Sequence, residues 1–94
     1  MKLLDELKER IVKMGNSTSA GRLARIGASM CHSSYSSVPF LDISVGFDRS
    51  NRDLVKRCLF ITDEPDYSNA DQFEFLNWLE QRGWDIERWS NKEI

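Results

Sequence analysis

The sequence predicts an α+β fold in one domain, residues 1–94: two N-terminal helices, a β-hairpin, a third helix and a short C-terminal strand that completes a three-stranded sheet. Three observations lead to this prediction. Apolar residues recur at helical spacing over residues 2–14 and 69–83, and they alternate with polar residues over 41–47. In addition, a glycine ends each of the two helical segments.

The first expected helix covers residues 2–14, because its apolar side chains share one face: Leu3, Leu4, Leu7, Ile11 and Met14. Gly15 is a suitable end for it, and residues 16–19 supply caps for a second helix over residues 20–31. The stretch GNSTSAGR, residues 15–22, has the composition of a phosphate-binding loop, but its spacing and its missing lysine differ from a P-loop. A helix cap is therefore the preferred interpretation, and an anion bound at this helix end is the alternative.

The second helix is rich in small residues, including Gly21 and Gly27. Glycine in a helix costs about 1 kcal/mol relative to alanine, so something is expected to approach this backbone closely. A neighbouring helix is the simpler explanation, and a ligand is the alternative.

A β-hairpin is expected over residues 41–62. Its first strand has alternating apolar residues: Leu41, Ile43, Val45 and Phe47. Residues 49–52, RSNR, form the turn, and residues 53–62 return as the second strand. With Asp48 opposite Asp53, three of the four inward pairs are apolar, and Lys56 points toward the core.

A third helix follows an acidic turn, because Ser68 and Asp71 form an imperfect capping box before residues 69–83. Residues 84–89, WDIERW, then alternate as a short strand would. Trp84 falls on one side of this strand and Trp89 on the other. The connection is long enough for the last strand to return parallel to the hairpin.

The composition indicates a cytoplasmic location and reduced thiols. The chain has no apolar run long enough to cross a bilayer, and its charged first ten residues do not form a signal-peptide core. Cys31 and Cys58 are the only cysteines, and without a secretory signal they are expected to be buried and unbridged.

The candidate chemical groups favour a non-catalytic protein without a metal or cofactor. His32 is the single histidine, and Cys31, His32 and Cys58 supply at most three zinc ligands, without a C-x-x-C pair. A catalytic pair of His32 with Cys58 or a carboxylate remains the alternative. Acidic residues also cluster in the turn at 63–66, where a solvated loop is preferred over a cation site.

The charge is unevenly distributed. Residues 1–57 carry ten Lys or Arg against six Asp or Glu, whereas residues 58–94 carry three against nine. The second helix and the hairpin tip contain the cations of a possible phosphate-binding face, and His32 ends the same helix face: Arg22, Arg25, His32, Arg49, Arg52 and Lys56. Internal pairing of these cations with Glu9, Asp42, Asp48 and Asp53 is the preferred interpretation, because a chain of net charge −2 tends to satisfy its cations internally.

The sequence thus predicts a small binding protein, such as an inhibitor, adaptor or regulatory subunit, that docks on another protein. Trp84 and Trp89 are candidate anchors beside an acidic rim, because tryptophan is enriched at interfaces. Nucleic-acid or nucleotide binding through the basic face is the alternative function. Self-association is a further expectation, since small domains often add buried area in this way.

Overall fold

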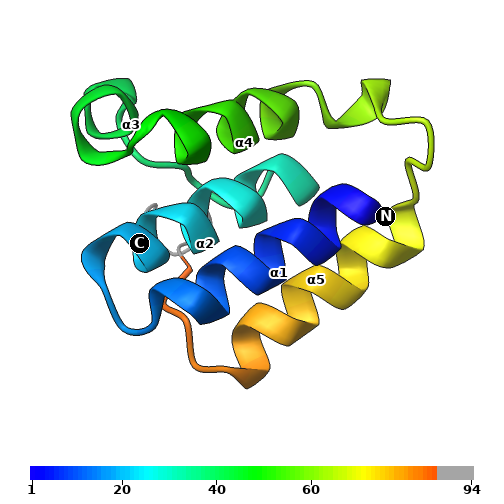
Figure 1. Cartoon of the computed structure of the whole chain (residues 1–94). Helices are drawn as coiled ribbons and strands as arrows, with labels where there is room; N and C mark the ends of the chain where they lie inside the picture. Colours follow the sequence, from blue (N-terminus) through cyan, green and yellow to red (C-terminus); the bar gives the residue numbers. More distant parts are fainter. Residues whose placement is uncertain (87–94) are drawn as a thin grey trace.

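The structure is a computed structural model, and it describes residues 1–86. This range contains five α-helices, one short 3-10 helix and no strand: α1 (Lys2–Met14), α2 (Thr18–Cys31), α3 (Phe40–Gly46), α4 (Arg49–Leu59), η1 (Ile61–Asp63) and α5 (Asn69–Gln81). The predicted α+β fold with a three-stranded sheet is therefore wrong. Helix α2 packs against α1, α4 and α5, and α3 lies at the start of α4 (Figure 1).

The ends of α1, α2 and α5 follow the predicted signals. Gly15 and Gly83 adopt positive φ values of 65° and 78°, which suit glycine and end the helices before them. The Ser17 side chain accepts a hydrogen bond from the Ala20 N–H, and the Ser68 side chain accepts one from the Asp71 N–H. The Ser68 cap confirms the predicted start of the third helix, and the Ser17 cap lies in the predicted capping segment, although α2 begins at Thr18, two residues earlier than predicted.

The core lies where α1, α2 and α5 meet. Each of these helices contributes an apolar stripe, and the largest fully buried side chains include Leu3, Leu7, Ile11, Leu23, Ile26, Phe75 and Leu79. A Cβ added to Gly27 would lie only 2.8 Å from Cε2 of Phe75. Gly27 is therefore one small residue of α2 that lets the neighbouring helix α5 approach the α2 backbone closely.

Residues 41–62 form two helices in place of the predicted hairpin. The Asp48 side chain accepts a hydrogen bond from the Asn51 N–H at 2.9 Å and thereby caps α4. Leu54, Val55 and Cys58 then reach the core at helical spacing. Lys56 is exposed, which corrects its predicted inward position.

The predicted C-terminal strand is not formed by the part of it that the structure describes. Residues 84–86 follow α5 without regular secondary structure. Residues 87–89, which include Trp89, lie outside the described range.

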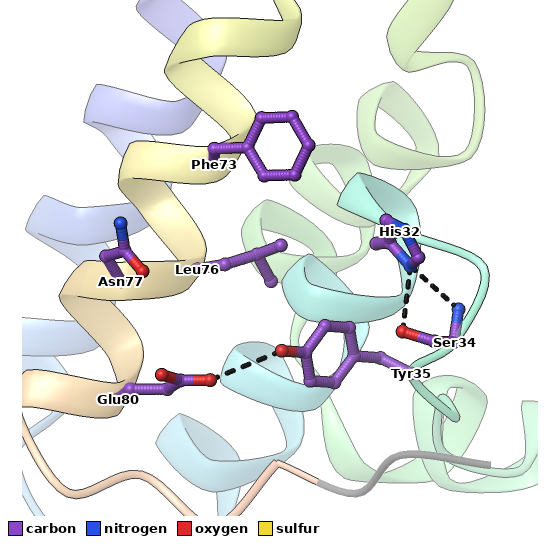
Figure 2. A pocket seen from close by; sticks show the side chains of 7 residues that line it. All are labelled: His32, Ser34, Tyr35, Phe73, Leu76, Asn77 and Glu80. Carbon is purple, nitrogen blue, oxygen red and sulfur yellow. Dashed lines mark hydrogen bonds between the residues drawn. The ribbon is translucent and has the colours of Figure 1, made fainter. Parts of the chain in front are cut away.

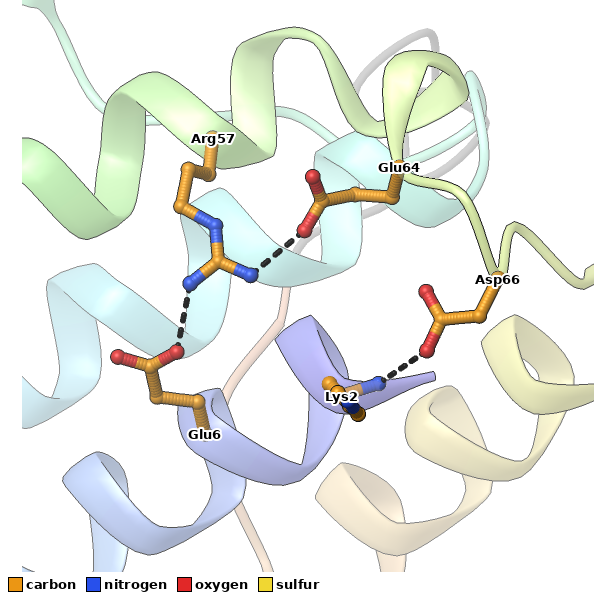
Figure 3. Close-up of polar contacts among 5 residues, drawn as sticks. All are labelled: Lys2, Glu6, Arg57, Glu64 and Asp66. Carbon is orange, nitrogen blue, oxygen red and sulfur yellow. Dashed lines mark hydrogen bonds and ion pairs between the residues drawn. The ribbon is translucent and has the colours of Figure 1, made fainter.

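Arg57 joins three parts of the fold (Figure 3). From α4, its guanidinium donates one hydrogen bond to Glu6 of α1 and one to Glu64 after η1, both at 2.6 Å. These bonds to Glu64 and Glu6 raise the pKa of Arg57 above its ordinary value. The side chain thus ties the far end of α4 to α1.

The acidic segment before α5 contacts the start of α1. The Lys2 backbone N–H donates a hydrogen bond to Asp66 at 2.7 Å (Figure 3), and the Met1 amino group pairs with Asp71. The Lys2 bond lowers the pKa of the Asp66 carboxyl. Its stabilising effect is therefore present above the unfolded pKa of that carboxyl, and it is lost as the pH falls through the folded value.

The contact between Gly27 and Phe75 predicts opposite effects of two glycine substitutions in α2. Gly27→Ala should lower the free energy of unfolding, because overpacking against a buried ring costs about 1–3 kcal/mol and outweighs the gain in helix propensity of about 1 kcal/mol. Gly21→Ala is the matched control: its Cβ would meet Trp84 at an ordinary 3.9 Å. It should raise the free energy of unfolding by about 0.5–1 kcal/mol. Urea denaturation of both variants measures the difference, and equal effects would contradict the close approach.

The Arg57 bridge predicts a salt-dependent contribution to stability. Arg57→Gln should lower the free energy of unfolding by about 1 kcal/mol at low ionic strength, because two partly exposed charge-assisted bonds are lost. The difference should shrink at about 1 M salt, where the Debye length is about 3 Å. Denaturation of both proteins at two salt concentrations is the test. Lys56→Gln is the control, since Lys56 makes only a long, exposed contact of 3.9 Å with Asp53.

Candidate functional site

Helix α3 presents an apolar surface to solvent. Phe40, Leu41 and Val45 are 83%, 69% and 73% exposed, and none of residues 40–46 is buried. These side chains and Ser44 lie on one side of the helix, which we call the α3 apolar face. Large exposed apolar groups gathered on one element are typical of interaction sites, whereas scattered ones are not.

The orientation of α3 is the reverse of a usual surface helix. Its polar Asp42 is half-buried, and the guanidinium of Arg22 packs against Gly46, so closely that it occupies the space of a side chain there. The Ser19 hydroxyl also lies 3.4 Å from the Gly46 carbonyl oxygen. Polar groups of α2 and the half-buried Ile43, which packs against the core, therefore hold the inner side of α3, and the other apolar residues face outward.

Charged groups of both signs lie near the last residue of α3. Arg22 contacts Gly46 on the inner side of the helix, and the exposed Asp48 and Arg52 lie at the start of α4. The α3 apolar face itself carries no charged side chain, so its distinguishing feature is exposed apolar area.

A cleft lies on the other side of this region, between the first half of α2, the start of α3 and the segment after α5. Its volume is about 480 Å³, and its lining includes Arg22, Arg25, Asp42 and Trp84. We call it the Arg22–Trp84 cleft. Three residues that the sequence singled out for binding, Arg22, Arg25 and Trp84, therefore come together in one place.

The other predicted cations lie elsewhere. Arg49 borders a groove between α1 and α4, and Arg52 and Lys56 are exposed on α4, so these three belong to a helix and not to a hairpin tip. One of the predicted internal pairs is present within residues 1–86, as a long contact of 3.9 Å between Lys56 and Asp53. Whether these residues bind a ligand stays a prediction.

His32 lies apart from the basic residues, at the end of α2. Its ring contributes to a small pocket of about 200 Å³ whose wall includes Tyr35, Phe73 and Glu80 (Figure 2). The ring nitrogen Nδ1 accepts a hydrogen bond from the Ser34 N–H at 3.1 Å, so the ring proton is on Nε2. The Tyr35 hydroxyl donates to Glu80 across the pocket at 3.3 Å.

Both cysteines are unbridged and poorly reactive. Cys58 is buried and Cys31 is half-buried, and burial raises the pKa of each thiol to about 12. A thiol with so high a pKa is a weak nucleophile near neutral pH. This argues against the alternative in which Cys58 acts as a catalytic group with His32.

The tryptophans differ in their surroundings. Trp78 stacks on Phe75 with ring centroids 6.0 Å apart, and Lys8 and Arg82 lie over its ring. Trp78 is therefore engaged within the protein, whereas Trp84 is half-buried and lines the cleft.

The sequence analysis missed the α3 apolar face. The alternating pattern predicts that Leu41 and Val45 face the core from a strand, and it gives Phe40 no role. The inward position of Leu41 and Val45 is wrong, because both are exposed. A signal was present: Pro39 is suited to the start of a helix, and the segment between Pro39 and Asp48 is only eight residues long.

Residues 1–86 contain no group of three or more His, Cys, Asp or Glu side chains arranged to hold a metal ion. Among the same residues, no helix combines the length and the apolar character that crossing a bilayer requires. No protein-family model matches the chain, and the searches of curated proteins and of solved structures found no similar protein.

Proposed function

We propose that the chain is a non-catalytic docking protein that binds a partner protein through the α3 apolar face. The observation that carries this proposal is the exposure of Phe40, Leu41 and Val45 on a helix with no buried residue. The partner would offer an apolar groove. A helix placed in an apolar groove is a common mode of peptide recognition.

The energy available from these side chains is sufficient for an anchor. Burying one large apolar side chain contributes about 1.5–3 kcal/mol, and α3 offers three of them. Interfaces usually depend on a few such anchors near their centre. Each exposed residue of α3 otherwise makes the free protein less soluble, so a partner that covers them accounts for their presence.

The uncharged face indicates the kind of groove that the partner would offer. The exposed side chains of Phe40, Leu41 and Val45 carry no charge, so the surface that receives them would be apolar. Affinity would then depend on burial of these anchors, and replacing them should mainly speed dissociation.

The double substitution Phe40→Ser and Val45→Ser tests this proposal. Both side chains are exposed, so the free energy of unfolding should change by no more than about 0.5 kcal/mol. Affinity capture from cell extract, followed by binding measurements with the purified partner, should show a loss of at least about 100-fold. Phe60→Ser is the matched control, because Phe60 is 63% exposed at the other end of α4.

The proposal requires a protein that binds the wild type and the Phe60→Ser control but not the double variant. If the captured proteins are the same for all three, docking through α3 is wrong. If the wild type is instead a dimer in sedimentation and the double variant a monomer, the occupant is a second copy of the chain. The proposal of a different partner is then wrong.

Nucleic-acid binding is a second candidate, favoured by the outward position of Arg49, Arg52 and Lys56 on α4. If all three contacted phosphates of a duplex, affinity would fall about 40-fold between about 50 and 200 mM salt. Fluorescence titration with duplex and single-stranded nucleic acid measures this dependence. Absence of binding at the lower salt concentration would exclude this candidate, and Arg52→Gln should reduce the salt dependence if it is correct.

A further inference from the structure

We infer that the Arg22–Trp84 cleft binds a mononucleotide, with the base against Trp84 and the phosphate on Arg22 and Arg25. This site is separate from the α3 apolar face and does not depend on the proposed docking function. The cleft brings together an indole ring, two guanidinium groups, a hydroxyl and two carboxylates, from Thr18, Arg22, Arg25, Asp42, Trp84 and Asp85.

The arginines and the ring are close enough to act on one ligand. Arg22 and Arg25 are three residues apart on α2, so their side chains leave the helix on the same side. Trp84 lies over the same helix at Gly21, where its Cζ3 atom is 3.9 Å from the position of an added Cβ. Because Gly21 has no side chain, the Trp84 ring lies close to the helix backbone, next to the residue that carries the Arg22 side chain.

Each part of a mononucleotide has a matching group in the cleft. Guanidinium groups bind phosphate oxygens through paired N–H donors, and indole rings stack on nucleobases. The carboxylates of Asp42 and Asp85 can accept hydrogen bonds from sugar hydroxyls or from base amino groups. A simple anion would use the arginines but neither the ring nor the carboxylates, so it explains fewer of the lining groups.

The size and exposure of the cleft also suit a small ligand. Its volume of about 480 Å³ is within the range of about 300–1,000 Å³ that small-molecule pockets usually have. Arg22, Arg25, Asp42 and Trp84 are each half-buried, and all four line the cleft. A nucleic-acid strand would in addition need a continuous track of cations, whereas the remaining exposed cations of α4 lie outside this cleft.

Titration of the full chain with AMP, monitored by backbone amide NMR, tests the inference. AMP should shift the amide signals of residues 18–25 and 84–85, with a dissociation constant below about 1 mM. Adenosine and inorganic phosphate, used as separate probes, should each bind at least about tenfold more weakly. GMP, CMP and UMP then show whether the base is discriminated.

Substitutions separate this site from general attraction of anions. Arg22→Gln should weaken AMP binding at least about tenfold, because one charge-assisted contact is lost. Arg49→Gln is the matched control and should leave it unchanged, since Arg49 lies outside the cleft. Trp84→Leu should also weaken it about tenfold. If that variant does not fold, Trp84→Phe, which keeps a ring, should retain binding within about threefold.

Three outcomes would overturn the inference. The first is the absence of amide shifts at about 10 mM AMP. The second is inorganic phosphate binding as tightly as AMP, which would indicate an anion site without a place for the base. The third is an equal loss of affinity for Arg49→Gln and Arg22→Gln, which would indicate nonspecific attraction of the anion to the arginines of the chain.

Discussion

The close approach of α5 to α2, where the ring of Phe75 lies against Gly27, is the contact on which the positions of the other helices depend. Because α2 has no side chain at this point, a large ring fills the centre of the core without displacing its neighbours. Helix α2 also contacts α1 and α4, so three neighbouring helices cover it along much of its length. Its first turns, beyond this contact, are left to form the cleft and to support α3.

This arrangement uses charged groups differently at two ends of the molecule. The starts of α2 and α4 lie near α3, and the acidic segment after η1 lies at the other end, beside the start of α1 (Figure 1). At the acidic end, Glu64 and Asp66 accept hydrogen bonds from Arg57 and from the Lys2 backbone, and these bonds join elements of the fold. At the opposite end, Arg22 and Arg25 line a cleft together with Asp42 and Asp85, so cations and carboxylates are gathered there around a space that a ligand can enter.

The sequence was sufficient to predict α1, α2 and α5, because their apolar residues repeat at helical spacing and their glycines and serines mark the ends. It was misleading over 41–62. Leu41, Ile43, Val45 and Phe47 alternate as in a strand, and the hairpin register pairs Leu54 and Cys58 with them. Leu54, Val55 and Cys58, however, are themselves spaced as on one helix face. Asp48 distinguishes the helical interpretation from the hairpin. It accepts a hydrogen bond from the Asn51 N–H and so caps α4 at the place where the hairpin would need a turn.

The same error explains why only part of the candidate site was foreseen. Arg22, Arg25 and Trp84 were each singled out from the sequence. They come together because the segment after α5 passes over Gly21, whereas the predicted strand over residues 84–89 placed Trp84 in a sheet.

The wrong strand prediction also concerns the alternating apolar residues of 41–47. A strand would bury all four on one face, whereas the helix turns Phe47 inward and Leu41 and Val45 outward. Leu41 and Val45 therefore contribute little to the core of this chain. A partner surface that covers them would gain the free energy of removing their apolar area from water.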